Sequence, residues 1–259
     1  MPSHGSAGKL FIVGTGPGML DQLSPRARKA IEEADYVIGN DSYLDSIAEL
    51  LTGKNVIRSS MGKEVDRAKQ AIELARAAPV AMVSGGDPGV YGMASIVLEV
   101  LDRSGADIPV EVVPGITAAS AAASRVGSPL SGDFAVISLS DLLTPLEVIE
   151  RRLDAVFALG IPVVLYNPRS GGRPHNFSRA MEIAGTHLPA ATPVAIVKNA
   201  FRDGEETILT TLGEIEAAIP RVDMHSTVIV GGKESRFWKA GGALRGVITP
   251  RGYDRKYVY

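Results

Sequence analysis

The sequence contains no cysteine among its 259 residues. This absence excludes disulfide bonds, thiolate nucleophiles, cysteine-ligated iron–sulfur clusters and thiolate zinc sites. The four histidines lie far apart and form no His-x-x-x-His pair, so their spacing gives no support for a histidine metal site. We therefore expect no resident metal ion.

A strong charge imbalance and a long apolar run are also missing. The formal net charge at pH 7 is −2, which predicts no general attraction to nucleic acid or to an anionic membrane. No stretch approaches the ~20 apolar residues that a membrane span needs. Residues 1–9 lack the apolar core of a signal peptide. We expect a cytoplasmic protein of enzyme size that binds neither nucleic acid nor membrane.

Short apolar runs alternate with helical patterns in the first half of the chain. Residues 10–13 predict a buried strand, and Ser24 followed by Pro25 predicts the start of a helix that runs to about Ala34. Strands that alternate with helices predict parallel βαβ units, in which ligand-binding loops follow the carboxyl ends of the strands. The further strands expected in this half are 36–38, 55–57, 79–83 and 110–113.

A turn-rich stretch from Gly127 to Gly132 predicts a domain boundary, with an N-terminal α/β domain at 1–126 and a C-terminal α/β domain at 127–259. The first domain is expected to have a mostly parallel sheet. In the second, strands at 207–212 and 226–230 follow with little helix between them, which predicts a mixed sheet. Before them, strands are expected at 134–139, 162–166 and 193–197 and helices at 145–159 and 176–187.

Glycine or polar residues follow several of the predicted strands. Glycine lets the backbone take a positive φ or approach a ligand closely. Each loop alone is typical of an ordinary turn, whereas a set of them at strand ends predicts a ligand site. The first loop does not fit a dinucleotide fingerprint, because its third glycine is Gly18 and Pro17 lacks an amide that could face a phosphate. The loops are 14–18, 85–92, 114–120, 166–169 and 198–201.

Four of these segments also form a recognisable series. They are Gly-Thr-Gly-Pro-Gly (14–18), Gly-Gly-Asp-Pro-x-x-Tyr-Gly (85–92), Val-Pro-Gly-Ile-Thr-Ala-Ala-Ser (113–120) and Leu-Tyr-Asn-Pro (165–168). In this order the motifs resemble those of the tetrapyrrole (corrin/porphyrin) methylase family, and the resemblance spans residues 9 to about 233. Segments 133–145, 166–170 and 249–253 are similar to its precorrin-3B C17-methyltransferase branch.

The resemblance implies an enzyme that uses S-adenosylmethionine to methylate C17 of precorrin-3B, with ring contraction, in cobalamin biosynthesis. It also implies a homodimer and a cofactor cleft between the two domains. Family members often have glycine where Ala200 stands. The implied cofactor-binding residues are Pro17, Gly85, Gly86, Asp87, Val90, Thr117 and Ala118 in the first domain and Tyr166, Asn167 and Ala200 in the second.

Candidates for catalysis are weaker. Related uroporphyrinogen methylases carry an aspartate, proposed as a proton acceptor, where this chain has Asn40, so no base role is transferred to that residue. Asp41 is the nearest candidate, and its alternative reading is a turn aspartate before Ser42. Lys63 aligns with a lysine near the substrate in the same relatives, and its alternative reading is a solvated lysine at a helix start.

A corrin precursor carries acetate and propionate groups, which arginine pairs well. Arg169 and Arg173 flank the loop after Tyr166 and are therefore candidates for substrate binding; ordinary surface charge is the alternative. Two other functions stay open at this point. One is a tetrapyrrole methylase of different regiospecificity, for C11 or C20, and the other is a non-catalytic nucleotide-binding module.

Overall fold

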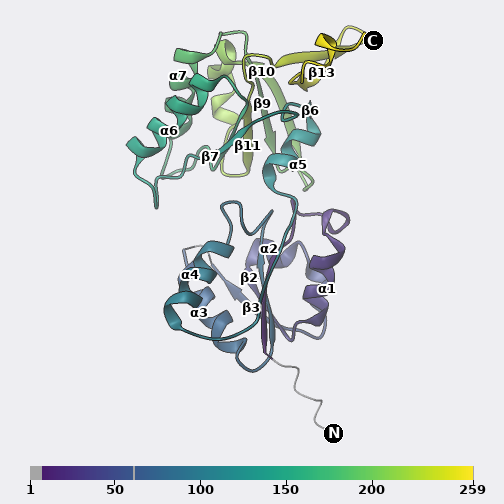
Figure 1. Cartoon of the computed structure of the whole chain (residues 1–259), viewed down its shortest axis with the longest axis vertical. Coiled ribbons are helices and arrows are strands. Elements are labelled where there is room, and N and C mark those ends of the chain that lie inside the picture. The colour runs from purple at the N-terminus through teal and green to yellow at the C-terminus, as the bar shows by residue number, and fades with distance from the viewer. Residues whose placement is uncertain (1–7, 61, 259) are drawn as a thin grey trace. The chain divides into compact units, whose positions relative to one another are not determined.

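A parallel five-stranded sheet forms the centre of the first part of the chain (Figure 1). The computed structural model describes residues 8–60 and 62–258. The strand order is β3-β2-β4-β1-β5, and all neighbours run parallel, as the alternation of strands and helices predicts. The strands are β1 (Lys9–Gly14), β2 (Tyr36–Asn40), β3 (Asn55–Ser59), β4 (Pro79–Ser84) and β5 (Val110–Val113).

Helices cover both faces of this sheet (Figure 1). Phe11 and Val13 of β1 share a core with α1 (Pro25–Glu33), whereas Leu10 and Ile12 share one with α3 (Glu64–Leu74) and α4 (Ala94–Ser104). Successive side chains of a strand point to opposite faces, so β1 is buried on both sides. The shorter elements are η1 (Leu20–Gln22), α2 (Asp41–Asp45) and η2 (Ala48–Leu50).

The start of α1 follows the sequence prediction. Ser24 precedes the helix, and its hydroxyl oxygen accepts a hydrogen bond from the backbone N–H of Ala27 at 3.1 Å. Pro25 occupies the first helical position, where no N–H is needed. This cap therefore sets the point at which the chain leaves the loop after β1 and enters the helix.

An ion-pair cluster ties edge strand β5 to its neighbours. The carboxylate of Glu111 accepts hydrogen bonds from Arg26 Nε at 2.6 Å, Arg26 Nη2 at 2.7 Å and Lys9 Nζ at 2.7 Å. The hydrogen bonds from Arg26 and then Lys9 lower the pKa of Glu111 from 4.5 to about 2, against a smaller opposing effect of desolvation. Residues of β5, α1 and β1 are thus joined by a bidentate arginine and a lysine.

The second part of the chain is built on a mixed five-stranded sheet of order β10-β9-β11-β8-β7. Strands β7 and β8 are parallel, whereas β11 runs antiparallel to both β8 and β9, and β10 runs antiparallel to β9. The mixed sheet predicted from the sequence is confirmed. The strands are β7 (Ala135–Ser138), β8 (Val163–Tyr166), β9 (Pro193–Lys198), β10 (Glu206–Thr211) and β11 (Ser226–Val230).

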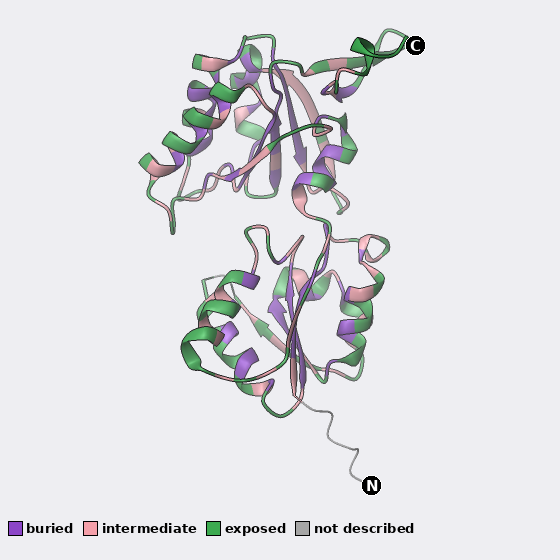
Figure 2. Ribbon diagram, viewed as in Figure 1, coloured by how far each residue is buried: buried purple, intermediate pink, exposed green. Residues whose placement is uncertain are grey.

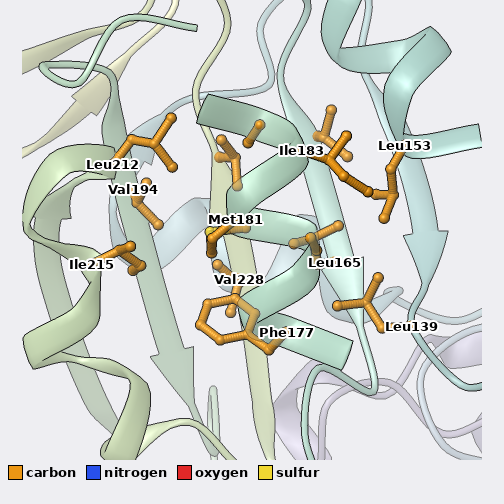
Figure 3. Packing of buried hydrophobic residues seen from close by; sticks show 14 of the residues in the cluster. Leu139, Leu153, Leu165, Phe177, Met181, Ile183, Val194, Leu212, Ile215 and Val228 are labelled. Atoms are coloured by element: carbon orange, nitrogen blue, oxygen red, sulfur yellow. The ribbon is translucent and has the colours of Figure 1, made fainter. Parts of the chain in front are cut away.

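Two long helices, α6 (Leu146–Leu159) and α7 (Asn176–His187), pack on one face of this mixed sheet. Phe177 and Met181 of α7 lie beside Val228 of the sheet in the view of Figure 3, and Leu165 of β8 belongs to the same buried cluster. Phe177 is fully buried, so this helix face is the centre of the second core. The short helices η3 (Leu212–Ala217) and η4 (Ile219–Arg221) follow β10. The sequence predicted that Leu212 would end the strand, but it is the first residue of η3.

A small third sheet of order β12-β13-β6 is absent from the sequence-based expectations. Its hairpin strands, β12 (Arg236–Ala240) and β13 (Ala243–Ile248), carry three basic residues and no clean alternation of apolar and polar residues. The sheet is completed by β6 (Gly127–Ser128), which lies in the turn-rich stretch, and it is followed by η5 (Tyr253–Arg255).

The described chain divides into two compact units between Ala118 and Ala119. This point lies earlier than the expected boundary at 126 and 127, because α5 (Ala118–Arg125) and the residue after it bond to the second unit. Tyr166 Oη accepts a hydrogen bond from the N–H of Ala119 at 2.7 Å, and Val126 accepts one from the N–H of Val247 at 2.7 Å. Across residues 8–60 and 62–258, no helix has both the length and the apolar character needed to cross a membrane.

Candidate functional site

In the first unit, three of the predicted loops leave the same edge of the sheet. Strand β1 lies between β4 and β5, and because all three run parallel their carboxyl ends meet. The backbone N–H of Thr15 donates to Ser84 at 2.9 Å, and Gly16 and Gly86 exchange two backbone hydrogen bonds of 3.1 and 2.8 Å. The loops after β1 and β4 are therefore joined by a bridge beyond the sheet.

The helices that follow these two strands lie on opposite faces. Helix α1, after β1, packs in one core, and α4, after β4, packs in the other. The two loops consequently diverge from neighbouring strands, which is the topological switch point of an open α/β sheet. Ligands of such sheets bind in the crevice outside the carboxyl ends at this point. The geometry thus favours the loops 14–18 and 85–92 as one wall of a ligand site.

Asp87 connects these loops to the third one. Its Oδ1 accepts the N–H of Gly89 at 2.8 Å, and its Oδ2 accepts the N–H of Gly115 at 3.0 Å. A Cβ on Gly115 would collide with the carbonyl oxygen of Gly86, so the two backbones approach as closely as glycine allows. Asp87 therefore holds the loop after β4 at a fixed distance from the loop after β5.

Backbone strain is concentrated in the predicted loops. The non-glycine residues with positive φ in the described part of the chain are Tyr91, Asn167, Asn199 and Phe201, with φ between 50° and 59°. All of them fall in the loops 85–92, 166–169 and 198–201. Residues other than glycine adopt a positive φ only at a cost in conformational energy, and residues with such strain cluster at ligand-binding sites.

The second unit has a loop edge of its own. Because β11 is antiparallel to both β8 and β9, these two strands are parallel to each other, and β7 runs parallel to β8. The loops after all three strands leave one edge, which brings together Ser138, Asn167 and the segment 199–201. Asn167 Nδ2 donates to Ser138 Oγ at 2.9 Å. Ala200 is half-buried between Asn199 and Phe201, both with positive φ.

The predicted substrate-binding arginines lie next to this edge. Arg169 Nη1 donates to the carbonyl oxygen of Ile219 at 3.2 Å, and Arg173 Nη2 contacts Met224 Sδ at 3.2 Å. Both partners are neutral, so neither contact cancels the charge of the guanidinium. The loop between the arginines is closed by hydrogen bonds between Ser170 and Arg173. Arg169 and Arg173 therefore present two positive charges from one short, closed loop.

Lysine 198, at the end of β9, is engaged in an ion pair. Lys198 Nζ lies 2.5 Å from Asp223 Oδ2. Partial burial opposes the ionisation of Asp223, but the Lys198 ammonium and the N–H of His225 outweigh this effect and lower the pKa of Asp223. The pair holds β9 to the turn before β11, which is a structural task for this lysine.

The two catalytic candidates lie on the surface of the first unit. Asp41, at the start of α2, is 58% exposed and accepts a hydrogen bond from Arg58 Nη1 at 3.2 Å. Lys63, just before α3, is 62% exposed and lies 3.8 Å from Asp66. Asn40 is explained by local structure, because its Oδ1 accepts from the N–H and the hydroxyl of Ser42 and so caps α2.

The other predicted cofactor residues of the first unit follow the loop geometry. Gly85, Gly86 and Asp87 are half-buried, as are Val90, Thr117 and Ala118, whereas Pro17 is buried. A Cβ on Gly86 would lie 3.7 Å from the N–H of Ala118 and 3.8 Å from Thr117 Cα. The first unit therefore brings its predicted cofactor residues to one edge, and the second unit does the same with Tyr166, Asn167 and Ala200.

Two features of these edges escaped the sequence reasoning. Ser138 accepts the side-chain hydrogen bond of Asn167; it lies in segment 133–145 but was not named as a site residue. Arg67 is 3% exposed, with Nη1 3.5 Å from the carbonyl oxygen of Ser59 and Nη2 3.6 Å from Met93 Sδ. Its Nε has no hydrogen-bond partner among the described residues. The sequence signal that could have predicted the burial of Arg67 is its position on the apolar face of α3, with Ala68 and Ala71.

No group of three or more histidine, aspartate or glutamate side chains in residues 8–60 and 62–258 is arranged to hold a metal ion. The groups that the two edges offer to a ligand are backbone N–H and C=O groups, side-chain hydroxyls, side-chain amides and arginines. Such groups suit an organic ligand with polar and anionic parts.

Comparison with known proteins agrees with this geometry. The family model of the tetrapyrrole (corrin/porphyrin) methylases matches residues 9–216. A Salmonella typhimurium protein named "Probable cobalt-factor III C(17)-methyltransferase" is 43% identical over 94% of this chain and 99% of its own length. A Sinorhizobium sp. precorrin-3B C(17)-methyltransferase is 41% identical over 95% of this chain and 97% of its own length.

The crystal structure of the methyltransferase CobJ matches with a TM-score of 0.87 and 34% identity, covering 94% of this chain and all of that chain. The chain spans only about half the length of two other curated relatives, which it matches at 44% and 42% identity over 97% of its own residues. The matching region thus occurs both alone and as part of longer proteins. With the family model covering most of its length and full-length relatives above 40% identity, the chain belongs to the tetrapyrrole (corrin/porphyrin) methylases.

Proposed function

We propose that this protein is a methyltransferase that transfers a methyl group from S-adenosylmethionine to C17 of a precorrin-3B-type corrin precursor, with ring contraction, in cobalamin biosynthesis. The observation that carries the proposal is the concentration of positive φ in loops 85–92, 166–169 and 198–201. These are the strand-end loops of a chain that aligns with a relative named as a C(17)-methyltransferase along 99% of that relative.

The loop residues fit the chemistry of S-adenosylmethionine. Its amino-acid head carries an ammonium and a carboxylate, which we propose pair with the backbone carbonyls of Gly85 and Gly86 and with the N–H of Gly85, since the N–H of Gly86 already donates to Gly16. Thr117 and Asn167 offer a hydroxyl and an amide for the ribose and adenine, and Val90 and Ala200 are small apolar contacts. We propose that Pro17, Asp87, Ala118 and Tyr166 fix the loops on which these groups stand; for Asp87 the bonds to Gly89 and Gly115 support this role.

Methyl transfer from S-adenosylmethionine needs no covalent intermediate with the protein. Bound S-adenosylmethionine supplies an electrophilic methyl group, and transfer to a ring carbon leaves S-adenosylhomocysteine. The residues of this chain bind, orient the reacting atoms in line and exclude water. Arg169 and Arg173 are proposed to pair with substrate carboxylates, because bidentate pairing with carboxylate is the strength of the guanidinium. Asp41 and Lys63 remain proposals for proton handling near the substrate.

A direct assay tests the proposal and its rivals. Purified protein is incubated with methyl-labelled S-adenosylmethionine and either precorrin-3B or cobalt-factor III, since the relatives' names include both substrates. Label transfer with the methyl group at C17 by NMR supports the proposal, and a methyl group at C11 or C20 assigns the chain to another branch. Cofactor binding by calorimetry without any transfer would leave a non-catalytic binding module.

Two further proposals concern assembly and location, the first from the family resemblance and the second from the sequence composition. We propose a homodimer, which sedimentation equilibrium tests, with a monomeric mass contradicting it. We also propose a cytoplasmic location, which fractionation of the source cells tests.

A further inference from the structure

The connection between β7 and α6 exposes two consecutive leucines. Leu142 is 78% exposed and Leu143 is 93% exposed. Figure 2 shows this connection in green where it projects from the second unit. It belongs to segment 133–145, whose sequence is similar to the C17 branch. Two adjacent and almost fully exposed leucines form an apolar patch, and such patches mark sites where another molecule binds.

The root of this loop is firmly held. The N–H of Leu139 donates to the carbonyl oxygen of Tyr166 at 2.8 Å, and the carbonyl oxygen of Leu139 accepts from Asn176 Nδ2 at 2.8 Å. Asn167 Nδ2 donates to Ser138 Oγ at 2.9 Å. The loop with the leucines is therefore bonded at its base to the loop after β8, which carries proposed cofactor residues.

The neighbouring loop supplies complementary chemistry. Strands β7 and β8 are adjacent and parallel, so their following loops leave the same edge of the sheet. One loop presents two leucines and the other presents Arg169 and Arg173. A tetrapyrrole has a broad apolar ring face and a rim of carboxylates, and these two loops match both parts.

We propose that Leu142 and Leu143 pack against the apolar face of the tetrapyrrole substrate and so determine its affinity and orientation. The inference rests on the proposed function and adds a substrate contact to it. Because the pair touches only substrate, its removal should weaken substrate binding and leave cofactor binding intact. An interaction equally strong in the ground state and the transition state changes KM and not kcat.

The test is the double variant Leu142→Ser with Leu143→Ser. The matched control is Leu159→Ser, a leucine that is 68% exposed at the other end of the adjoining helix α6. We expect KM for the tetrapyrrole to rise roughly tenfold to hundredfold in the double variant. The Kd of S-adenosylmethionine by calorimetry and the melting temperature stay as in the wild type, and the control matches the wild type in every measurement.

Three results would overturn the proposal. An unchanged KM shows that the leucines do not touch substrate. An equal loss of cofactor affinity shows that the pair supports the cofactor loop instead. A double variant that sediments as a monomer when the wild type is a dimer shows that the leucines face another subunit. If the wild type transfers no methyl group, the proposed function fails, but the leucine proposal can still be tested. Absorbance titration then measures the Kd of the tetrapyrrole for the wild type and for the double variant.

Discussion

Replacing Asp87 by alanine removes the side chain that joins two loops of the proposed cofactor site. Two backbone N–H groups lose a carboxylate acceptor, at 2.8 Å for Gly89 and 3.0 Å for Gly115. A hydrogen bond to a charged group contributes about 1.5–3 kcal/mol. Gly89 is exposed, and water takes the place of the carboxylate there. The bond to Gly115 is partly buried and accounts for most of the loss, so we expect Asp87→Ala to lower the free energy of unfolding by about 2 kcal/mol.

That loss is small enough for the protein to remain folded and large enough to measure. For a chain of this size about 2 kcal/mol corresponds to a fall in Tm of roughly 4–8 °C. The affinity for S-adenosylmethionine should fall about tenfold or more, equivalent to about 1.4 kcal/mol, because the loop after β4 is no longer held to the loop after β5. Thermal melts and calorimetric titration of the same preparations measure the two effects.

Two further variants sharpen this experiment. Asp87→Asn keeps one acceptor oxygen but turns an NH2 group toward the other backbone N–H, so we expect an intermediate effect on both Tm and cofactor affinity. Asp107→Ala, at an exposed aspartate before β5, is the control and should behave as the wild type. A wild-type Tm for Asp87→Ala would refute the hydrogen-bond argument. A lowered Tm with unchanged cofactor affinity would remove Asp87 from the site.

Other perturbations test the scaffold and the second unit. Arg26 and a lysine lower the pKa of Glu111 to about 2, so the contribution of its carboxylate to stability is complete above pH 4.5 and is lost as the pH falls toward 2. In urea unfolding, Glu111→Gln should therefore lower the free energy of unfolding by about 1 kcal/mol at pH 7 and leave it unchanged near pH 2. A difference that does not depend on pH would contradict this. Tyr166→Phe removes the acceptor of the Ala119 N–H and should cost about 1 kcal/mol of stability in denaturant unfolding, with no loss meaning that water replaces the hydroxyl. Phe177→Ala opens a cavity in the second core and should cost about 3–5 kcal/mol in the same assay, whereas a cost below about 1 kcal/mol would show that the core collapses around it.

The sequence predicted the alternating strands and helices because their signals are local. Ser24 and Pro25 fix the start of α1, and α7 and β11 have the bounds that their apolar patterns predict. The hairpin of β12 and β13 was missed, since its exposed and charged strands lack the alternation that marks a half-buried sheet. Its pairing with β6 joins residues far apart in the chain, which no local pattern encodes.

The places of the candidate loops at the strand ends were predictable, whereas their internal bonds were not, and their role in cofactor binding stays a prediction. Glycine content and strand-end position pointed to the loops, and the family resemblance implied the cofactor. The sequence could not tell that both oxygens of Asp87 are taken by backbone N–H groups, because Gly115 comes from another loop. For the same reason it could not tell that Arg67 is buried beside Met93. The cap that Asn40 makes on α2 is local, because its partner Ser42 is two residues away, and it was overlooked in favour of the family comparison.

The division between Ala118 and Ala119 also bears on how the protein is made. Each unit is one continuous stretch of chain with its own core. During synthesis at about 5–20 residues per second, the ribosome needs on the order of ten seconds for the second stretch. The strands of the first sheet are all available by then, so it can close while the rest of the chain is still emerging. A nascent chain is thereby spared from holding both sets of apolar strands unfolded at the same time.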